Sequence, residues 1–291
     1  MLDKSRGKLR KNSYANRIIK KFMRNKLAVA GGITLALIIL MSIAAPLLTP
    51  HDPMQVDLSL KYAKPSLTHI LGGDAVGRDL WSRVLYGGRV SILIALVCAI
   101  GTHAIGTIFG CLCGFFQGKV DMLFMTAGDI ISCFPQQILI MIIIGFFSQN
   151  VLIMIAIMTL TSWAGTMRVV RARILSLKTE PYVESLKANG ISSVSIMFRH
   201  MLPNTMGLII INVTGSIGGF VLTEAALSFL GLGVPKGTAT WGNMLNAASS
   251  LTVIASSTAV WLVPCVAISL FVLSANFLGD GLRDVFDVTS N

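Results

Sequence analysis

Six long apolar stretches constrain this chain more than any other feature. The first, 27–48, carries no charged residue. As a helix rising about 1.5 Å per residue it is about 33 Å long, enough to cross a hydrocarbon core of about 30 Å. The other stretches are 90–115, 122–147, 151–167, 205–223 and 253–278. We therefore expect an all-α membrane protein with six transmembrane helices and both termini on one side.

Composition agrees with this expectation. Hydrophobic residues make up 54% of the 291 residues and charged residues only 13%. A soluble domain carries about 25% charged residues, so an ordinary soluble enzyme is excluded. The cysteines all lie in apolar stretches, where we expect small buried side chains and neither disulfides nor a zinc site. They are Cys98, Cys111, Cys113, Cys133 and Cys265.

Basic residues are distributed unequally between the two sides of the membrane. On the predicted topology, 18 of the 24 lie on the side of the N-terminus. The positive-inside rule then places both termini in the cytoplasm. The net charge of +11 reflects topology and attraction to anionic membrane lipid, not nucleic acid. The predicted segments are a basic cytoplasmic tail (1–26), the first helix (27–48), an external loop (49–89), a five-helix core (90–278) and a cytoplasmic tail (279–291).

The later part of the external loop has a helical charge pattern. Asp74 precedes Arg78 by four residues, and Asp79 precedes Arg83 by four. Acid-before-base pairs at this spacing stabilise helices by a few tenths of a kcal/mol each. We therefore expect a surface helix over 71–83.

The cytoplasmic loop 180–203 carries the most informative pattern. Residues 179–181 are typical of a helix start, and Asn189–Gly190 is typical of a helix end. A second short helix follows, with an apolar face made of Val194, Met197 and Met201. The loop thus predicts two short amphipathic helices with a bend at Gly190. Their apolar stripe fits either a partner protein or the lipid headgroups.

Residues of this loop resemble a known family. Glu184, Gly190, Leu202 and Pro203 have the spacing E-x5-G-x11-L-P, which resembles the EAA signature of permease subunits of binding-protein-dependent ABC importers. The blocks 71–91, 224–234 and 241–245 are similar to the dipeptide, oligopeptide and nickel subfamily, and in particular to its C-type permease. The resemblance extends from Asn25 to about Asp287.

The sequence departs from the signature at two positions. Ser185 and Leu186 replace the two alanines of the EAA triplet. Small residues there let the coupling helix lie close against its partner. Leu186 is therefore interpreted as a knob in a groove of the ATPase.

The resemblance implies a type I ABC importer permease fold in a bacterial cytoplasmic membrane. A sister permease would complete a heterodimeric pore, two cytosolic ATPases would use ATP and Mg, and an extracytoplasmic substrate-binding protein would deliver the cargo. The chain itself would be no enzyme and would bind no cofactor or metal, since its nearest match to a phosphate-binding loop, 114–120, has the wrong spacing. The implied coupling residues are Glu184, Leu186, Gly190, Val194, His200, Leu202 and Pro203. The candidate receptor contacts are Asp74, Arg78, Asp79, Glu224 and Trp241.

Several polar residues have two interpretations each. His103 either lines a substrate path or bonds to a neighbouring helix. Asp129 requires a partner, for which Arg168, Arg171 and Arg173 are the candidates. Glu224 either contacts a receptor or pairs with Arg78, Arg83 or Arg89.

Glycines and prolines within the spans also predict structure. Gly106, Gly110, Gly114 and Gly118 form a small-residue stripe that favours close helix packing, with a gate hinge as the alternative. Pro135 and Pro264 are expected to kink their helices or leave carbonyls free.

The preferred cargo is a di- or oligopeptide. The first alternative is a nickel or metallophore importer of the same family. The second is an ion-coupled secondary transporter acting alone, which would require inverted repeats and broken helices at the membrane midplane.

Overall fold

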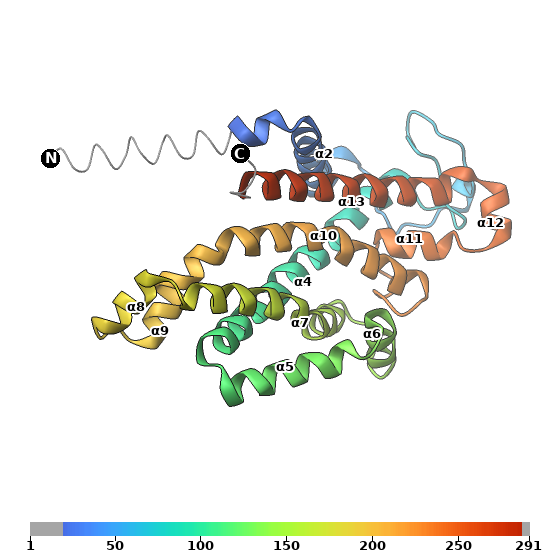
Figure 1. Ribbon diagram of the computed structural model, residues 1–291. Helices are drawn as coiled ribbons and strands as arrows, with labels where there is room; N and C mark the ends of the chain where they lie inside the picture. Colours follow the sequence, from blue (N-terminus) through green and yellow to red (C-terminus); the bar gives the residue numbers. More distant parts are fainter. Residues whose placement is uncertain (1–19, 287–291) are drawn as a thin grey trace.

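The computed structural model describes residues 20–286, and all regular structure in this range is helical. Most of the predicted tail 1–26 and the last five residues of the tail 279–291 lie outside it. The helices are α2 (Lys26–Ile43), α3 (Ala45–Leu48), α4 (Leu80–Phe116), α5 (Gly118–Ser132), α6 (Gln136–Gly145), α7 (Val151–Lys178), α8 (Pro181–Ala188), α9 (Ser193–Ser195), α10 (Met206–Phe229), α11 (Trp241–Ala247), α12 (Leu251–Ser256) and α13 (Thr258–Phe286) (Figure 1). Short 3-10 turns cover Leu58–Leu60 and Leu202–Thr205, and a π-helical turn covers Ile196–Met201.

Five helices are long and apolar enough to cross a membrane, namely α2, α4, α7, α13 and the continuous run Ser193–Phe229. The predicted third span, 122–147, is instead two helices, α5 and α6, which meet at 85°. Pro135 stands at this break as the cap of α6, because proline lacks the N–H group that a continuing helix needs. Pro264 lies inside α13, which continues through it to Phe286.

The glycine stripe packs α4 against α7. A β-carbon added at Gly106 would lie 2.6 Å from Cβ of Thr166, and one added at Gly110 would lie 2.7 Å from the carbonyl oxygen of Met167. Gly114 is equally close to α7, so the packing interpretation is confirmed at three of the four positions. Gly118 has open space around it and a φ of +58°, and it begins α5 after a sharp turn.

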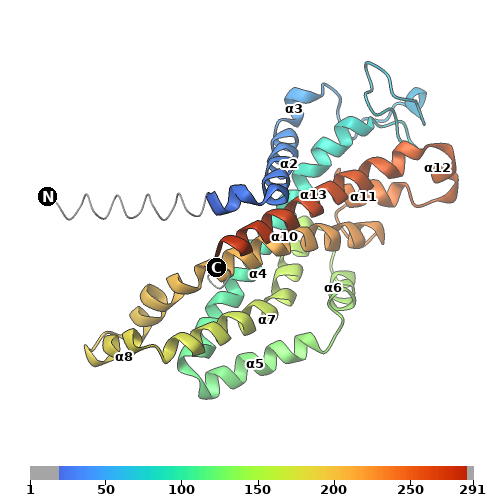
Figure 2. The ribbon, with the colours of Figure 1, turned by 45° about the horizontal axis from the view of Figure 1, so that its top comes forward.

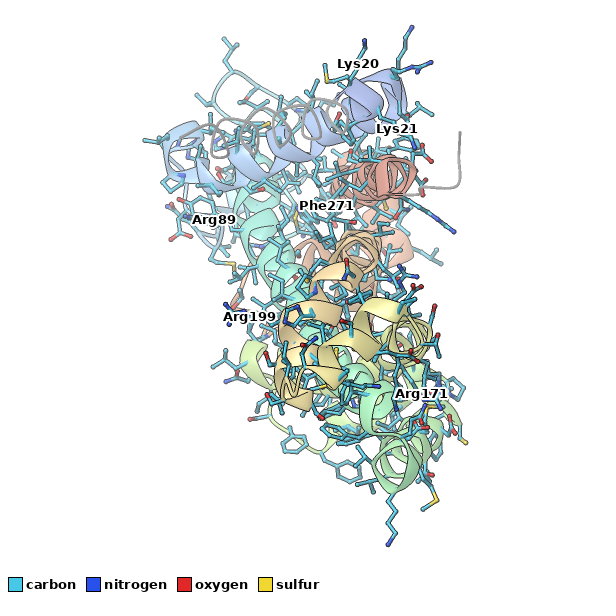
Figure 3. The ribbon with its side chains drawn as sticks, turned by 60° about the vertical axis from the view of Figure 1, so that its left-hand side comes forward. Lys20, Lys21, Arg89, Arg171, Arg199 and Phe271 are labelled. Atoms are coloured by element: carbon cyan, nitrogen blue, oxygen red, sulfur yellow. The ribbon has the colours of Figure 1, made fainter. Side chains whose placement is uncertain are left out.

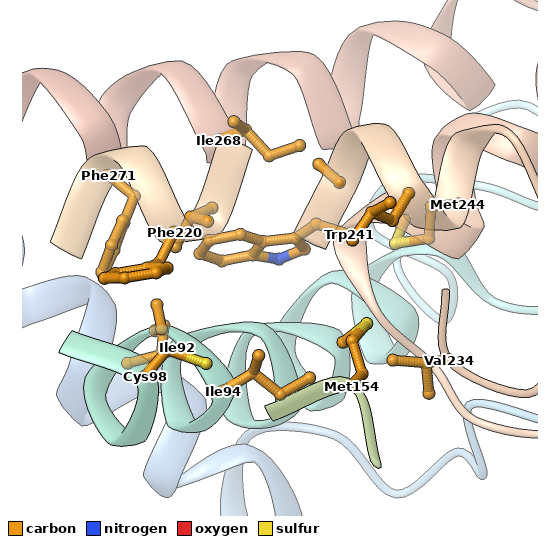
Figure 4. Close-up of a cluster of buried hydrophobic side chains, with 14 of the residues drawn as sticks. Ile92, Ile94, Cys98, Met154, Phe220, Val234, Trp241, Met244, Ile268 and Phe271 are labelled. Carbon is orange, nitrogen blue, oxygen red and sulfur yellow. The ribbon is translucent and has the colours of Figure 1, made fainter. Parts of the chain in front are cut away.

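The largest core cluster joins α4, α7, α10, α11 and α13 (Figure 4). Trp241 is nearly fully buried there, and its ring meets that of Phe271 edge-on at 5.7 Å, a favourable aromatic geometry. Cys98, Cys111 and Cys113 are buried as expected, but Cys133 is exposed at the break after α5 and Cys265 is half-buried. The prediction that all five cysteines are buried is therefore wrong for Cys133.

The two ends of the molecule carry different elements. α8 and α9 lie at the same end as the beginning of α2 and the end of α13, whereas α11, α12 and the loop before α4 lie at the opposite end (Figures 1 and 2). Seen from the α8 side, Lys20, Arg89 and Arg199 lie at the periphery and Phe271 lies inside (Figure 3).

The predicted surface helix over 71–83 is wrong before Leu80, where α4 begins. Gly72 and Gly77 have φ angles of +77° and +85°, a left-handed conformation that helices exclude. The carboxylate of Asp74 accepts two hydrogen bonds from following backbone N–H groups, each 2.9 Å long, and so closes a turn. The four-residue spacing of Asp74 and Arg78 therefore belongs to a folded loop and not to a helix.

Candidate functional site

A groove of about 700 Å³ lies between α4, α6, α7, α10 and α13. Its lining is mainly hydroxyl and amide side chains with glycines between them, and two charged residues come from the last turns of α13. The polar lining residues are Thr102, His103, Gln136, Ser162, Thr166, Asn212, Ser216, Thr223, Asn276, Asp280 and Arg283. Such a surface offers hydrogen bonds to a polar chain while carrying little charge of its own.

Sequence reasoning missed most of this groove, although the signal was present. Asn212, Ser216 and Thr223 lie on α10 with Gly215 and Gly219 between them. These positions follow helical spacing and share one face of an otherwise apolar span. This stripe of polar residues and glycines in a membrane helix is the sequence signal that marks the groove.

His103 is the one predicted polar site that lines the groove. Its side chain is nearly buried, and its Nδ1 lies 2.8 Å from the carbonyl oxygen of Ala99 in the same helix. The expected bond to a neighbouring helix is therefore wrong for Nδ1. The alternative, that His103 lines a substrate path, stays a prediction.

Asp129 has the partner that the sequence required. Arg168 donates to its carboxylate at 2.7 Å, and a second pair joins Asp121 to Arg171 through two hydrogen bonds of 2.6 and 2.5 Å. The arginines belong to α7 and the aspartates to α5, so the two ion pairs fasten α5 to α7. Asp129 itself is exposed in this chain, not buried.

The predicted bend at Gly190 in the loop 180–203 is confirmed. α8 ends there with a φ of +73°, and the N–H of Gly190 donates to the carbonyl of Lys187 at 3.0 Å. Glycine adopts this conformation without the steric conflict that a β-carbon causes. The chain then turns into α9, from which helical structure runs through Pro203 into α10.

The side chains of this segment divide into an inner and an outer set. Val183, Met197 and Met201 are buried against α4 and α7. Leu186 is half-buried and packs against the same cluster, so only part of its side chain is left to act as the predicted knob. The outer set consists of the exposed apolar residues Tyr182, Val194 and Phe198, of which Val194 is 57% exposed. Among the other predicted coupling residues, Glu184, Gly190 and Pro203 are exposed, and His200 and Leu202 are half-buried.

The predicted receptor contacts lie mostly inside the protein. Asp74 is buried and pairs with Arg78 at 2.7 Å and with Arg83 at 3.7 Å. Asp79 is buried, caps α4 and contacts His69 at 2.9 Å. Buried side chains offer no surface to a docking protein. The prediction is therefore wrong for Asp74, Asp79, Glu224 and Trp241, and Arg78 is half-buried.

Glu224 is 0% exposed and is held by hydroxyl groups, not by an arginine. Ser91 of α4 donates to one carboxyl oxygen at 2.9 Å, and Ser228 of α10 donates to the other at 2.8 Å. The backbone N–H of Trp241 donates to the same Ser91 hydroxyl oxygen at 3.2 Å. The predicted pairing with an arginine is wrong, and the carboxyl instead joins α4, α10 and α11.

This network predicts different stabilities for two substitutions. Glu224→Gln keeps a side chain that can hydrogen-bond both serines, so we expect it to be nearly as stable as the wild type. Glu224→Leu leaves buried hydroxyl groups without partners, so it should destabilise by about 1–3 kcal/mol. Thermal unfolding in detergent measures both. Equal unfolding temperatures for the two variants would contradict a bonding role for the carboxyl.

Comparisons with known proteins agree with this architecture. Residues 106–288 match the family model described as binding-protein-dependent transport system inner membrane component. Residues 13–65 match the N-terminal TM domain of oligopeptide transport permease C.

Similar proteins cover nearly the whole chain. The oligopeptide transport system permease protein OppC of Haemophilus influenzae is 35% identical over 92% of this chain and 86% of its own length. The glutathione transport system permease protein GsiD of Pectobacterium atrosepticum is 38% identical over 92% and 89%. The dipeptide transport system permease protein DppC of Bacillus subtilis is 32% identical over 94% and 86%. The chain is thus a multi-pass membrane permease subunit that belongs to the family of binding-protein-dependent transport system inner membrane components.

Proposed function

We propose that this chain forms half of the pore of an ATP-driven importer for di- and oligopeptides. The groove carries the proposal. Every residue of a peptide presents a backbone N–H and a C=O group, and a lining of hydroxyls and amides can bond these groups whatever the side chains are. The names of the similar permeases, which specify oligopeptides, dipeptides and glutathione, support the same substrate class.

The proposed topology has six spans, with both termini in the cytoplasm. Asn25, just before α2, donates a hydrogen bond of 3.0 Å to Asp284 near the end of α13. The beginning of the first span and the end of the last therefore share one side, which requires an even number of crossings. Five continuous helices give an odd number, so the bent pair α5 and α6 supplies the sixth. The excess of basic residues makes the shared side cytoplasmic.

The proposed partners follow from the two ends of the molecule. At the cytoplasmic end, the exposed outer set on α8 to α10 is the surface for ATPases, which would bind ATP and Mg. A sister permease would face the groove and close it into a pore. An extracytoplasmic binding protein would dock at the opposite end, around α11 and α12.

The competing functions predict other features. A nickel or metallophore path requires ligands, and no group of three His, Cys, Asp or Glu side chains in residues 20–286 is placed to hold a metal ion. A stand-alone ion-coupled carrier leaves the exposed cytoplasmic segment without a task. The peptide importer accounts for both the groove and this segment.

Uptake by a reconstituted complex tests the proposal. The chain, its sister permease and the ATPases are placed in proteoliposomes with the binding protein, and entry of a labelled dipeptide is measured with and without ATP. We expect uptake only with ATP, and competition by unlabelled tripeptide and pentapeptide but not by chelated nickel. Uptake driven by an ion gradient without ATP, or competition by nickel alone, would contradict the proposal.

A further inference from the structure

α5 is bounded by a backbone break at each end. Gln117, between α4 and α5, has φ +57° and ψ −161°, a region that is almost reserved for glycine. Gly118 follows with φ +58°, and a β-carbon there would meet nothing within 4 Å. At the other end, the chain turns by 85° before α6. A 15-residue helix between two such breaks has places where it can turn as a rigid piece.

Besides its two ion pairs, α5 packs on α4 and α7 through one small apolar cluster, to which it adds the half-buried Phe124, Met125, Ala127 and Ile131. Gly128 is the buried residue of this helix, and Phe124 stacks on Phe109 of α4 with ring centroids 4.4 Å apart. The guanidinium of Arg171 holds Asp121 by two hydrogen bonds, a geometry that fixes direction as well as distance. Arg168 holds Asp129 and also donates to Ser132 at 3.1 Å, so both ends of α5 are fastened to α7.

α5 and α7 also connect the groove to the cytoplasmic segment that contains α8. Gln136, the first residue of α6, lines the groove and donates to Ser162 of α7 at 2.6 Å. α7 continues from there through Arg168 and Arg171 to Lys178, and α8 begins at Pro181. A displacement of α8 would therefore be transmitted along α7 to the ion pairs, and from α5 to the groove wall at Gln136.

We infer that α5 is a movable strap whose Asp121–Arg171 and Asp129–Arg168 pairs open and close with the nucleotide state and so set the width of the groove at Gln136. This inference rests on the proposed transport function. It makes Arg168 and Arg171 positioning residues, since they act on the groove through α5 and α6 and do not line it.

The chain offers a native reporter for this motion. Cys133 is exposed at the break after α5, whereas Cys98, Cys111 and Cys113 are buried. A Cys265→Ser background with Leu273→Cys, an exposed position of α13, allows two spin labels. α13 and α5 lie on opposite sides of the molecule (Figure 1), so the distance between the labels reports displacement of the strap.

Double electron–electron resonance on the reconstituted complex is the test, without nucleotide and after trapping with ATP and vanadate. We expect the distance distribution of the parent protein to shift between the two states. Arg171→Asp opposes two carboxylates, so its distribution should be broad in both states and its ATP-driven peptide uptake should fall about fivefold or more, the lower end of typical coupling effects. The double exchange D121R/R171D restores opposite charges and should recover both the shift and the uptake.

Arg173→Asp is the matched control, because Arg173 is an exposed residue of the same helix without an ion pair to the described residues. We expect it to behave as the parent. An unchanged distribution in a parent complex that transports peptide would overturn the strap and leave the proposed function intact, as would equal damage by R173D and R171D. A parent complex without ATP-driven uptake would overturn the proposed function and the strap together.

Discussion

A Gly190→Pro variant is expected to reach the membrane in normal amount and to transport no peptide. The backbone at Gly190 has φ +73°, whereas proline fixes φ near −65°. Proline also removes the N–H that donates to Lys187. The end of α8 and its angle to α9 therefore cannot form. The spans on either side do not depend on this residue, since a β-carbon at Gly190 would meet nothing within 4 Å.

The measurement compares membrane-inserted protein with ATP-driven peptide uptake. Gly190→Asn is the matched control, because asparagine tolerates the left-handed conformation better than other residues, and we expect it to retain most of the uptake. Normal uptake by the proline variant would show that the bend has no part in coupling. If both variants inserted normally and lost uptake, the cause would be the presence of a side chain at position 190 and not the backbone angle.

Gly110→Ala is expected to destabilise the protein, whereas Gly219→Ala should not. The new β-carbon at Gly110 would lie 2.7 Å from both the Met167 carbonyl oxygen and Cβ of Val170, and neither atom belongs to the flexible end of a side chain. Forcing α4 and α7 apart should cost about 1–3 kcal/mol. Gly219 lies in a helix with nothing within 4 Å of the added carbon, so alanine there should stabilise by about 0.4–1 kcal/mol.

Thermal unfolding of the detergent-purified variants measures this difference. We expect the two alanine substitutions to shift the midpoint in opposite directions. A Gly110→Ala protein as stable as the wild type would mean that α4 and α7 are not packed as closely as described. The account of the glycine stripe would then be wrong.

Features set by single-residue geometry were predictable from the sequence. The bend at Gly190 and the close packing at Gly106, Gly110 and Gly114 follow from the absence of a β-carbon. Gly118 belongs to the same repeat but serves a turn with a positive φ, because α4 ends before it. The repeat alone does not contain that information.

The hydrogen-bond partners of buried polar groups were predicted less well. The carboxylate of Asp74 bonds backbone N–H groups of a turn, although its spacing to Arg78 equally fits a helix. Glu224 bonds two serines that lie 133 and four residues away, while the sequence offered arginines. Such choices are made by tertiary packing, which one sequence does not display.

The groove shows the opposite case, because polar residues and glycines at helical spacing on α10 mark it in the sequence. Polar side chains on the α10 face are sparse, so they do not lower the apolar character of the span. In the third span, 122–147, the sequence predicted a kink at Pro135, and the structure has a break of 85° there.

Crosslinking from Val194 most directly tests whether the segment around Gly190 is a lever moved by ATPases. Val194 is the most exposed apolar residue of the outer set, so Val194→Cys, in a background where Cys133 and Cys265 are replaced by serine, carries a short photoreactive crosslinker without disturbing the inner set. In native membranes we predict one main product, which contains an ABC ATPase and whose yield changes when ATP and vanadate are added. Products with lipid alone, in membranes where the ATPases are present, would contradict the account.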